Sequence, residues 1–344
     1  MNTPRLRALI LCAGLAKRLR PLTTGVPKAL LPVLGRPLIE ITLEQLDAAG
    51  VEAVAINLHH RGEAIASTMG SVYGRMPLHY SRESELLGTL GAVYPLQEFL
   101  CEADLVLLVN GDSLCLWPIE AMVERHLGSG SGATLLLTTV ADVASFGGVG
   151  IDGEERIVSF PGGAFAPSET RRLVWAGAHL LEPELLRDVR PGPSDSVVDL
   201  YRPLLETGGR LQALVSDVPW HDLGSPQRYL EALLGWAIPT ECAKADGSWF
   251  GGGAAVDATA VVRGSIVEVG ASIAADAKLV ESVVLGGARV GAGAHLERAL
   301  LAPGVMLEPG SRVTGEMVTP SSWGLTATSR QSASLVYTPL EGSA

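Results

Sequence analysis

The chain has 344 residues, of which 47% are hydrophobic and 18% charged, and its formal net charge is −11. This length allows two domains, and the composition is that of an ordinary packed protein. The acidic balance argues against a nucleic acid partner, because proteins that bind polyanions normally carry basic surfaces. No apolar run approaches the length that spans a bilayer, and none has the flanks of a signal peptide, so we expect a cytoplasmic protein with no membrane partner. The four cysteines form no CxxC pair and no zinc-ligand spacing, which favours reduced thiols.

Short apolar runs alternate with helical patterns through the first two thirds of the chain. The apolar runs predict strands at 7–12, 53–57, 78–81, 105–109 and 134–140. The helical patterns lie at 37–49, 61–69, 89–100, 118–127 and 196–207. This alternation predicts βα units and a mostly parallel α/β sheet. Ligands bind beyond the carboxyl ends of such strands, so we expect the loops after 7–12 and 105–109 to face one crevice.

An internal repeat begins near residue 250. Glycines recur 17 residues apart, and so do two sets of aliphatic residues, with alanines between them. This is the pattern of hexapeptide β-helix repeats, in which each hexad forms one side of a triangular coil. We therefore predict one domain at 1–240 and a parallel β-helix at 250–318. Residues 319–344 have few charges and no period, and we expect a loosely ordered tail.

The stretch LCAGLAKRLRPLTTGVPKALLPV, residues 11–33, concentrates cations after a buried strand. The prolines fix the path of the loop, and Gly14 lets the backbone aim N–H groups at a ligand. Fixed N–H donors together with Arg and Lys form a phosphate cradle, although a solvated surface turn is the alternative reading. The stretch is neither a Walker loop nor a GxGxxG dinucleotide motif, because Ala16 stands where a second glycine belongs.

This stretch resembles the signature of sugar-1-phosphate nucleotidylyltransferases, LAAGxGTRLxPLTxxxPKPLxPV. Further segments that are similar to the family's later motifs follow in order: INLHH, LLGTLG, VNGDS, FGGVG and WHDLGSPQRYLEA. The likeness covers roughly residues 5–235. It implies a Rossmann-like sheet of the nucleotide-diphospho-sugar transferase type, followed by a short left-handed β-helix.

The resemblance also implies a reaction. A phosphate oxygen of a sugar 1-phosphate attacks the α-phosphorus of a nucleoside triphosphate, and pyrophosphate leaves. Arg18 and Lys28 would be the catalytic cations that neutralise charge on the phosphates. Asp112 and Asp222 would hold Mg²⁺, which suits few carboxylates plus substrate phosphates. The remaining roles are nucleotide binding by Ala13, Gly14, Leu15, Gly88 and Thr89, and sugar binding by Asn110 and Gly148.

Each assignment has a structural alternative. Asp112 suits the N-cap of the next helix, and Asp222 suits a turn with Ser225. The chain also departs from the family pattern on the sugar side. Ser159-Phe160-Pro161 stands where Glu-Lys-Pro is frequent, so the Lys that reaches the sugar phosphate is missing, and Ala176 stands where Asn is frequent. The other departure is Ala16 in the phosphate loop, which we expect to stiffen it.

Three functions remain open at this point. The first is an active nucleotidylyltransferase that couples an NTP to a sugar 1-phosphate, like mannose-1-phosphate guanylyltransferases or the uridylyltransferases for N-acetylmuramate or glucose 1-phosphate; LLGTLG favours GTP over UTP. The second is a catalytically silent sensor of nucleotide sugars, favoured by the altered sugar side. The third is a bifunctional enzyme whose β-helix transfers acyl groups, with His295 as its candidate residue. We expect the β-helix to mediate homo-oligomerisation. Neither the base, the sugar nor the pathway is indicated by the sequence.

Overall fold

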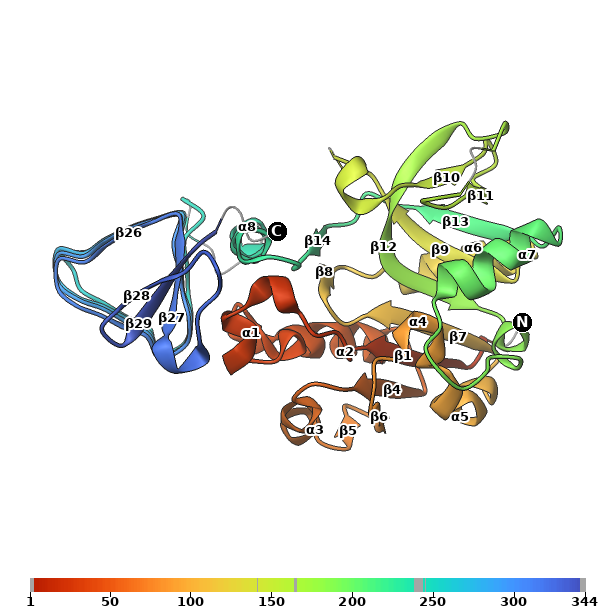
Figure 1. The fold of residues 1–344 in the computed structure, drawn as a ribbon, viewed down its shortest axis with the longest axis horizontal. Coiled ribbons are helices and arrows are strands. Elements are labelled where there is room, and N and C mark those ends of the chain that lie inside the picture. Colours follow the sequence, from red (N-terminus) through yellow and green to blue (C-terminus); the bar gives the residue numbers. More distant parts are fainter. Residues whose placement is uncertain (1–2, 141, 164–165, 238–243, 245, 341–344) are drawn as a thin grey trace. The chain divides into compact units, whose positions relative to one another are not determined.

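A computed structural model describes residues 3–140, 142–163, 166–237, 244 and 246–340 (Figure 1). The contacts within it divide the chain into two compact units. Unit 1 contains Met1–Leu15 and Ile39–Trp220, and unit 2 contains Ala16–Leu38 and His221–Ala344. The contacts group residues 16–38, which include most of the signature stretch, with the C-terminal third of the chain. The boundary near residue 240 stays a prediction.

Unit 1 is built on a mixed, mostly parallel sheet. Its strands are β1 Leu6–Leu11, β4 Ala53–Leu58, β5 Val72–Tyr73, β6 Met76–Arg82, β7 Leu105–Asn110, β8 Ser113–Cys115, β9 Ala133–Thr138, β10 Val149–Ile151, β11 Ile157–Ser159, β12 Arg171–Leu181 and β13 Leu211–Val215. Its helical segments are α2 Leu38–Ala48, α3 Gly62–Met69, α4 Gly88–Gly91, η3 Tyr94–Leu96, α5 Gln97–Cys101, α6 Ile119–Ser129, η4 Ala144–Phe146, η5 Pro183–Leu186, η6 Val197–Tyr201 and α7 Arg202–Glu206.

The strand order in this sheet is β11-β10-β12-β7-β1-β4-β6-β5; β9 also pairs with β12, and β13 pairs with β9. Strands β7, β1, β4 and β6 run parallel, and β12 runs antiparallel to β7. The parallel strands are almost wholly apolar, as strands covered on both faces must be. Helix α5 packs on β1 and β7, and α6 packs on β9, β12 and β13. The predicted, mostly parallel α/β sheet is confirmed. The sequence patterns did not indicate the long antiparallel strand β12 or the strands β5, β8, β10, β11 and β13.

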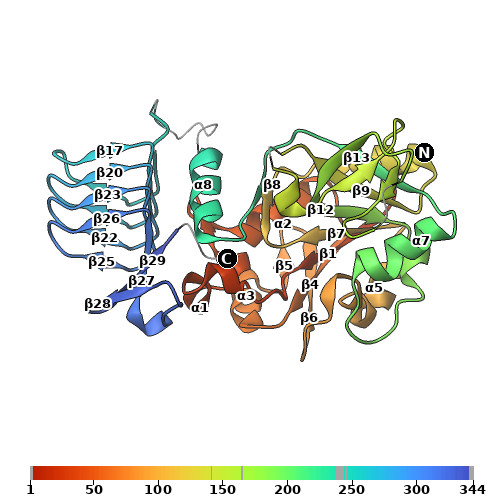
Figure 2. The same cartoon turned by 45° about the horizontal axis from the view of Figure 1, so that its top comes forward.

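Unit 2 contains three parallel sheets wound as coils (Figure 2). Its coil strands are β15 Trp249–Phe250, β16 Ala255–Val256, β17 Val261–Arg263, β18 Ile266–Val267, β19 Ser272–Ile273, β20 Lys278–Val280, β21 Val283–Val284, β22 Arg289–Val290, β23 His295–Glu297, β24 Leu300–Leu301, β25 Met306–Leu307, β26 Arg312–Thr314 and β27 Glu316–Pro320. Its other elements are η1 Lys17–Leu19, α1 Leu22–Gly25, η2 Lys28–Leu30, β2 Pro32–Val33, β3 Arg36–Pro37, α8 Pro226–Ala237, η7 Ser321–Trp323, β28 Arg330–Ser332 and β29 Leu335–Pro339; β14 Trp220–Asp222 begins in unit 1.

The repeat sets the register of the coils. Each strand pairs in parallel with the strand 17 residues on, so Ile273 lies beside Val290 and Leu279 beside Leu296. These aliphatic side chains are buried, as the hexapeptide pattern predicts. A buried ladder of Ser248, Ser265 and Ser282 adds hydrogen bonds between coils: the Ser282 N–H donates to Ser265 Oγ at 3.0 Å.

The C-terminal segment differs from its expectation. Where the sequence predicts a loose tail from residue 319, the described residues to 340 continue the coil sheet. Strand β29 pairs antiparallel with both β27 and β28. This reversal covers the last strand of one coil sheet, which is a common way to end a β-helix.

Candidate active site

The carboxyl ends of the parallel strands of unit 1 surround a cavity of about 300 Å³. Residues predicted from separate segments of the sequence line it together: Ala13, Gly14, Gly88, Thr89, Asn110 and Asp112. The other lining residues are Leu11, Asn57, Glu83 and Leu86. Leu15 and Gly148 are not among them. Leu15 is half-buried next to Gly14, and Gly148 is buried just before β10.

Strand pairing explains why the signature loop and the NGD motif meet. Leu11 lies beside Asn110 in the parallel β1–β7 pair, so the residues that follow both strands leave the sheet at the same point. The Gly111 N–H donates to the Leu11 carbonyl at 3.0 Å. A Cβ on Gly111 would overlap Cys12 Sγ, so only glycine lets the NGD turn pack this closely. Burial raises the pKa of the Cys12 thiol, which fits a packing residue and not a nucleophile.

Asn57 and Glu83 form a polar network that the sequence analysis missed. Asn57 accepts the Cys12 N–H at 2.7 Å and donates to Glu83 Oε1 at 2.7 Å. The other Glu83 oxygen accepts the Leu87 N–H at 3.0 Å. Both side chains are buried, so these hydrogen bonds fix the signature loop against the segment that leads to Gly88. Asn57 could have been found as a polar residue within a buried apolar strand. Nothing in the sequence indicated a role for Glu83.

The Gly88 turn is fixed from behind by residues 194–196. Gly88 has φ +76, and a Cβ there would overlap the Ser194 carbonyl oxygen. That oxygen accepts the N–H groups of Leu90 and Gly91 at 3.1 and 3.2 Å. The Thr89 hydroxyl bonds the hydroxyl of Ser196 at 3.0 Å and accepts its N–H at 2.9 Å. The turn is therefore held rigid before any ligand binds.

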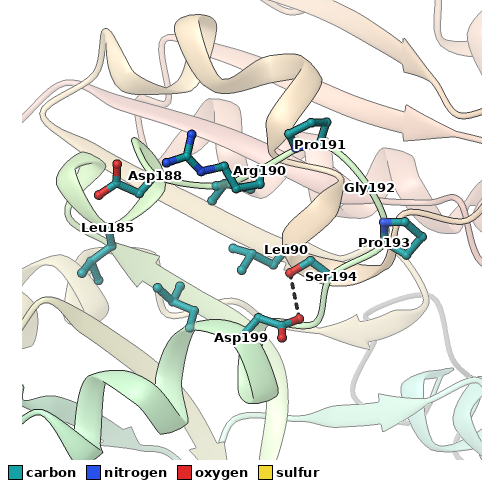
Figure 3. Close-up of a pocket in the computed structure, with 11 residues that line it drawn as sticks. Leu90, Leu185, Asp188, Arg190, Pro191, Gly192, Pro193, Ser194 and Asp199 are labelled. Carbon is teal, nitrogen blue, oxygen red and sulfur yellow. Dashed lines mark hydrogen bonds between the residues drawn. The ribbon is translucent and has the colours of Figure 1, made fainter.

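A second cavity, of about 360 Å³, lies behind this turn (Figure 3). Leu90 lies on its floor, the Pro191–Pro193 loop lies along one side, and Ser194 donates a hydrogen bond to Asp199 at 2.8 Å. Ser194 thus contacts both the second cavity and the Gly88 turn. Arg190 and Asp188 also line this cavity, but the mixture of charges and apolar groups indicates no particular class of ligand.

A glycine of β12 shapes the end of β7 at the cavity. A Cβ on Gly177, which has φ +92, would overlap the side chain of Asn110. Strand β12 changes register against β9 between Trp175 and His179, so Gly177 lies at an irregularity that leaves room for Asn110. The amide of Asn110 therefore has a defined place where β7 ends at the cavity.

Unit 2 carries the other predicted groups. Gly224 lies between two of them, because a Cβ there would be 2.7 Å from Asp222 Oδ2 and 2.8 Å from an Arg18 guanidinium nitrogen. Asp222 also accepts a hydrogen bond of 2.5 Å from Arg228, a partner that the sequence analysis did not name. Arg18 and Asp222 are thus brought together within unit 2. Lys28 is half-buried at the start of η2.

Segment 16–38 is anchored to the rest of unit 2 at several points. Tyr229 of α8 donates to the Pro32 carbonyl at 2.5 Å, and the Gly35 N–H donates to Glu268 of the β-helix at 3.1 Å. Trp323 packs on Gly25 so closely that a Cβ there would overlap its ring. Ala16, at the start of the segment, has φ 45 and ψ 40, the left-handed conformation that glycine adopts freely. Ala16, which stands where the family has glycine and was expected to stiffen the loop, therefore also carries backbone strain.

The predicted magnesium ligands lie in different units, Asp112 in unit 1 and Asp222 in unit 2. Asp112 lines the first cavity, and Asp222 accepts a hydrogen bond from Arg228. Mg²⁺ takes one or two carboxylates and completes its shell with phosphates and water. Within the described part of the chain, no three or more His, Cys, Asp and Glu side chains gather into a cluster that would hold a metal ion.

Comparisons with known proteins agree with this architecture. The profile of the family described as nucleotidyl transferase matches residues 7–236, and that of the GlmU-like C-terminal hexapeptide region matches residues 238–321. The chain therefore belongs to the nucleotidyl transferase family and carries a hexapeptide region C-terminal to the part that the family profile matches. The family prediction made from the sequence is confirmed.

Among its relatives, the chain is 29% identical over 245 residues to a UTP–glucose-1-phosphate uridylyltransferase of Synechocystis, covering 67% of this chain and 63% of that protein. It is 28% identical to the mannose-1-phosphate guanylyltransferase catalytic subunit beta of Danio rerio, covering 75% and 73%. It is 29% identical to mannose-1-phosphate guanylyltransferase of Mycobacterium tuberculosis, covering 67% and 64%. The chain thus spans about two thirds of the length of these proteins.

The fold is also found in the crystal structure of HddC from Yersinia pseudotuberculosis, with a TM-score of 0.56 at 22% identity, covering 67% of this chain and 99% of that one. The same protein has been solved in complex with GMP-PN. No helix in the described ranges is long and apolar enough to cross a membrane.

Proposed function

We propose that the protein is an active sugar-1-phosphate nucleotidylyltransferase that joins an NTP, GTP in preference to UTP, to a sugar 1-phosphate and releases pyrophosphate. The observation that carries this proposal is the cavity of unit 1, which is lined jointly by Gly14, Gly88, Thr89, Asn110 and Asp112. These residues come from separate segments of a chain that belongs to the nucleotidyl transferase family. A cytoplasmic location accords with this activity.

The proposed roles follow from the chemistry of each group. The backbone around Ala13, Gly14 and Leu15 donates N–H groups to phosphate oxygens, and the rigid Gly88–Thr89 turn holds the base or the sugar. Arg18 stabilises the charge of the leaving pyrophosphate, and Lys28 stabilises the α-phosphate as negative charge develops there. Asn110 and the Gly148 turn contact the sugar.

When bound, Mg²⁺ would neutralise phosphate charge and align the attacking and leaving oxygens. Asp112 and Asp222 would hold it, and Arg228 would orient Asp222 through its hydrogen bond. No general base is needed, because a phosphate oxygen is already a nucleophile.

The test is pyrophosphate release with Mg²⁺, each NTP in turn and a panel of hexose and N-acetylhexosamine 1-phosphates. We expect turnover with GTP, and a fall of about 100-fold in kcat for Lys28→Ala and Asp112→Asn. Lys278→Ala and Asp217→Asn change exposed residues of the same types and are matched controls. If no pair gives pyrophosphate while a nucleotide sugar still binds tightly, the protein is a sensor instead.

We also propose that the protein is a homo-oligomer that associates through its β-helix. The first coil supports this proposal, because Val256 and Val261 are exposed on edge strands whose backbone has one unpaired side among the described strands. Light scattering of the full chain and of a Val256→Asp, Val261→Asp variant tests it. A monomeric mass for the unaltered chain at micromolar concentration would exclude this association.

A further inference from the structure

Arg172, on β12, is the centre of a polar cluster on the sugar side of unit 1. Its Nε donates to Glu169 Oε1 at 2.9 Å and one terminal nitrogen donates to Glu169 Oε2 at 2.7 Å, a bidentate ion pair. The same terminal nitrogen bonds Ser159 Oγ at 3.1 Å, and the other donates to the Gly148 carbonyl at 3.0 Å. The Ser159 hydroxyl donates to Glu169 at 2.6 Å. Every member of the cluster is therefore hydrogen-bonded to another member.

The FGGVG motif is shaped around this cluster. A Cβ on Gly148 would overlap the aliphatic stem of Arg172, and a Cβ on Gly150 would overlap Glu169 and Ser159. Gly150 also lies beside Arg172 in the antiparallel β10–β12 pair. The two glycines thus leave the space that the ion pair fills, and the pair in turn fixes the backbone of the turn.

The guanidinium of Arg172, whose side chain is 38% exposed, is paired with a buried carboxylate. The Glu169 carboxylate that it pairs with is only 5% exposed, and bidentate geometry makes this a strong, oriented interaction. Ser159 belongs to this cluster, whereas its neighbour Phe160 is buried in the apolar core.

We propose that Arg172 is a positioning residue for sugar 1-phosphate recognition: it holds the Gly148 turn in place, through its stem and its bond to the Gly148 carbonyl, without touching the substrate. This inference rests on the proposed function, in which the Gly148 turn contacts the sugar. Glu169 and Ser159 orient the guanidinium. Lysine in place of Arg172 has one terminal nitrogen and cannot make the bidentate pair and the carbonyl bond together.

Steady-state kinetics of pyrophosphate release, with each substrate varied in turn, test the proposal. Arg172→Ala is expected to raise the KM for the sugar 1-phosphate about 10-fold and to leave the KM for the NTP within about twofold. Arg172→Lys should give an intermediate value. Arg171→Ala is the matched control, because Arg171 is the exposed neighbour whose side chain leaves the opposite face of β12. Glu169→Gln serves if Arg172→Ala does not fold, because an amide has one acceptor oxygen and cannot keep the bidentate pair or its charge.

The outcomes separate two failures. An unaltered chain that is silent with every substrate pair refutes the proposed function and this inference with it. An active chain in which Arg172→Ala leaves the sugar KM unchanged, or raises both KM values equally, refutes the inference alone. An equal loss in all three variants, Arg171→Ala included, would show that the effect is general destabilisation, and that result too would overturn the proposal.

Discussion

Glu268 is a buried carboxylate that joins the β-helix to the signature segment. Glu268 is 2% exposed, and its carboxylate accepts the Gly35 N–H at 3.1 Å. Burial raises the pKa of Glu268 to about 7, although hydrogen bonds from the backbone of Gly35, Gly286 and Leu34 act in the opposite direction. The folded protein therefore binds a proton at Glu268 more tightly than the unfolded chain does.

The size and sign of the effect follow from linkage. A pKa that rises from 4.5 to about 7 corresponds to about 3 kcal/mol, at about 1.4 kcal/mol per pKa unit. Because the folded-state pKa is the higher one, this stabilisation is fully present below pH 4.5 and is lost as the pH rises through 7. We therefore predict that Glu268 lowers the free energy of unfolding by about 3 kcal/mol between pH 4.5 and pH 8.

The assay compares the unaltered chain with Glu268→Gln in denaturant unfolding at pH 5, 6, 7 and 8. The difference between the two curves isolates Glu268 from other titrating groups, such as the buried His179, whose pKa burial lowers to about 3. The variant should gain stability relative to the unaltered chain as the pH rises. Glu308→Gln, on an exposed β-helix residue, should follow the unaltered chain. Parallel curves for Glu268→Gln and the unaltered chain across this range would refute the reasoning.

Three further substitutions test other parts of the site. Ala16→Gly should raise the free energy of unfolding by about 1 kcal/mol in urea, because Ala16 has φ 45; a loss of stability would show that the left-handed conformation carries no strain. Gly25→Ala should displace Trp323, whose ring fills the Cβ position, and lower both the melting temperature and kcat; an unchanged near-ultraviolet tryptophan spectrum would contradict this. Thr89→Val removes the hydroxyl that makes two partly buried hydrogen bonds with Ser196, and we expect the NTP KM to rise about 10-fold, since such a loss costs about 1–2 kcal/mol; an unchanged KM would exclude a role for this support.

Local patterns predicted the fold well because periodicity follows directly from backbone geometry. Strands β1, β4 and β7 are covered on both faces and are therefore almost wholly apolar, which a single short segment of sequence shows. The spacing of 17 residues is also a local property, since each coil repeats the environment of the previous one. Gly14 and Asp112, which follow strand ends, could be placed at one cavity because parallel strands end at one edge of the sheet.

The unpredicted parts depend on partners that are distant in the chain. Glu83 joins Asn57 and Leu87 only after β4 and β6 have paired. In the sequence, Arg172 is one of two adjacent arginines with no assigned role. Its partner Ser159 is noted only as part of a departure from the family pattern. Their roles are visible only when the antiparallel pairing of β10 with β12 brings them to Gly148. Such pairs leave no periodic trace in a single sequence.

The signature stretch is divided between the two units, and its cations lie in unit 2. Gly14 belongs to unit 1, whereas Arg18 and Lys28 lie in segment 16–38, which belongs to unit 2. That segment is held by Glu268 and Trp323, far along the chain. Because these anchors fix the backbone that carries Arg18 and Lys28, substitutions in the β-helix are expected to lower the proposed pyrophosphate release.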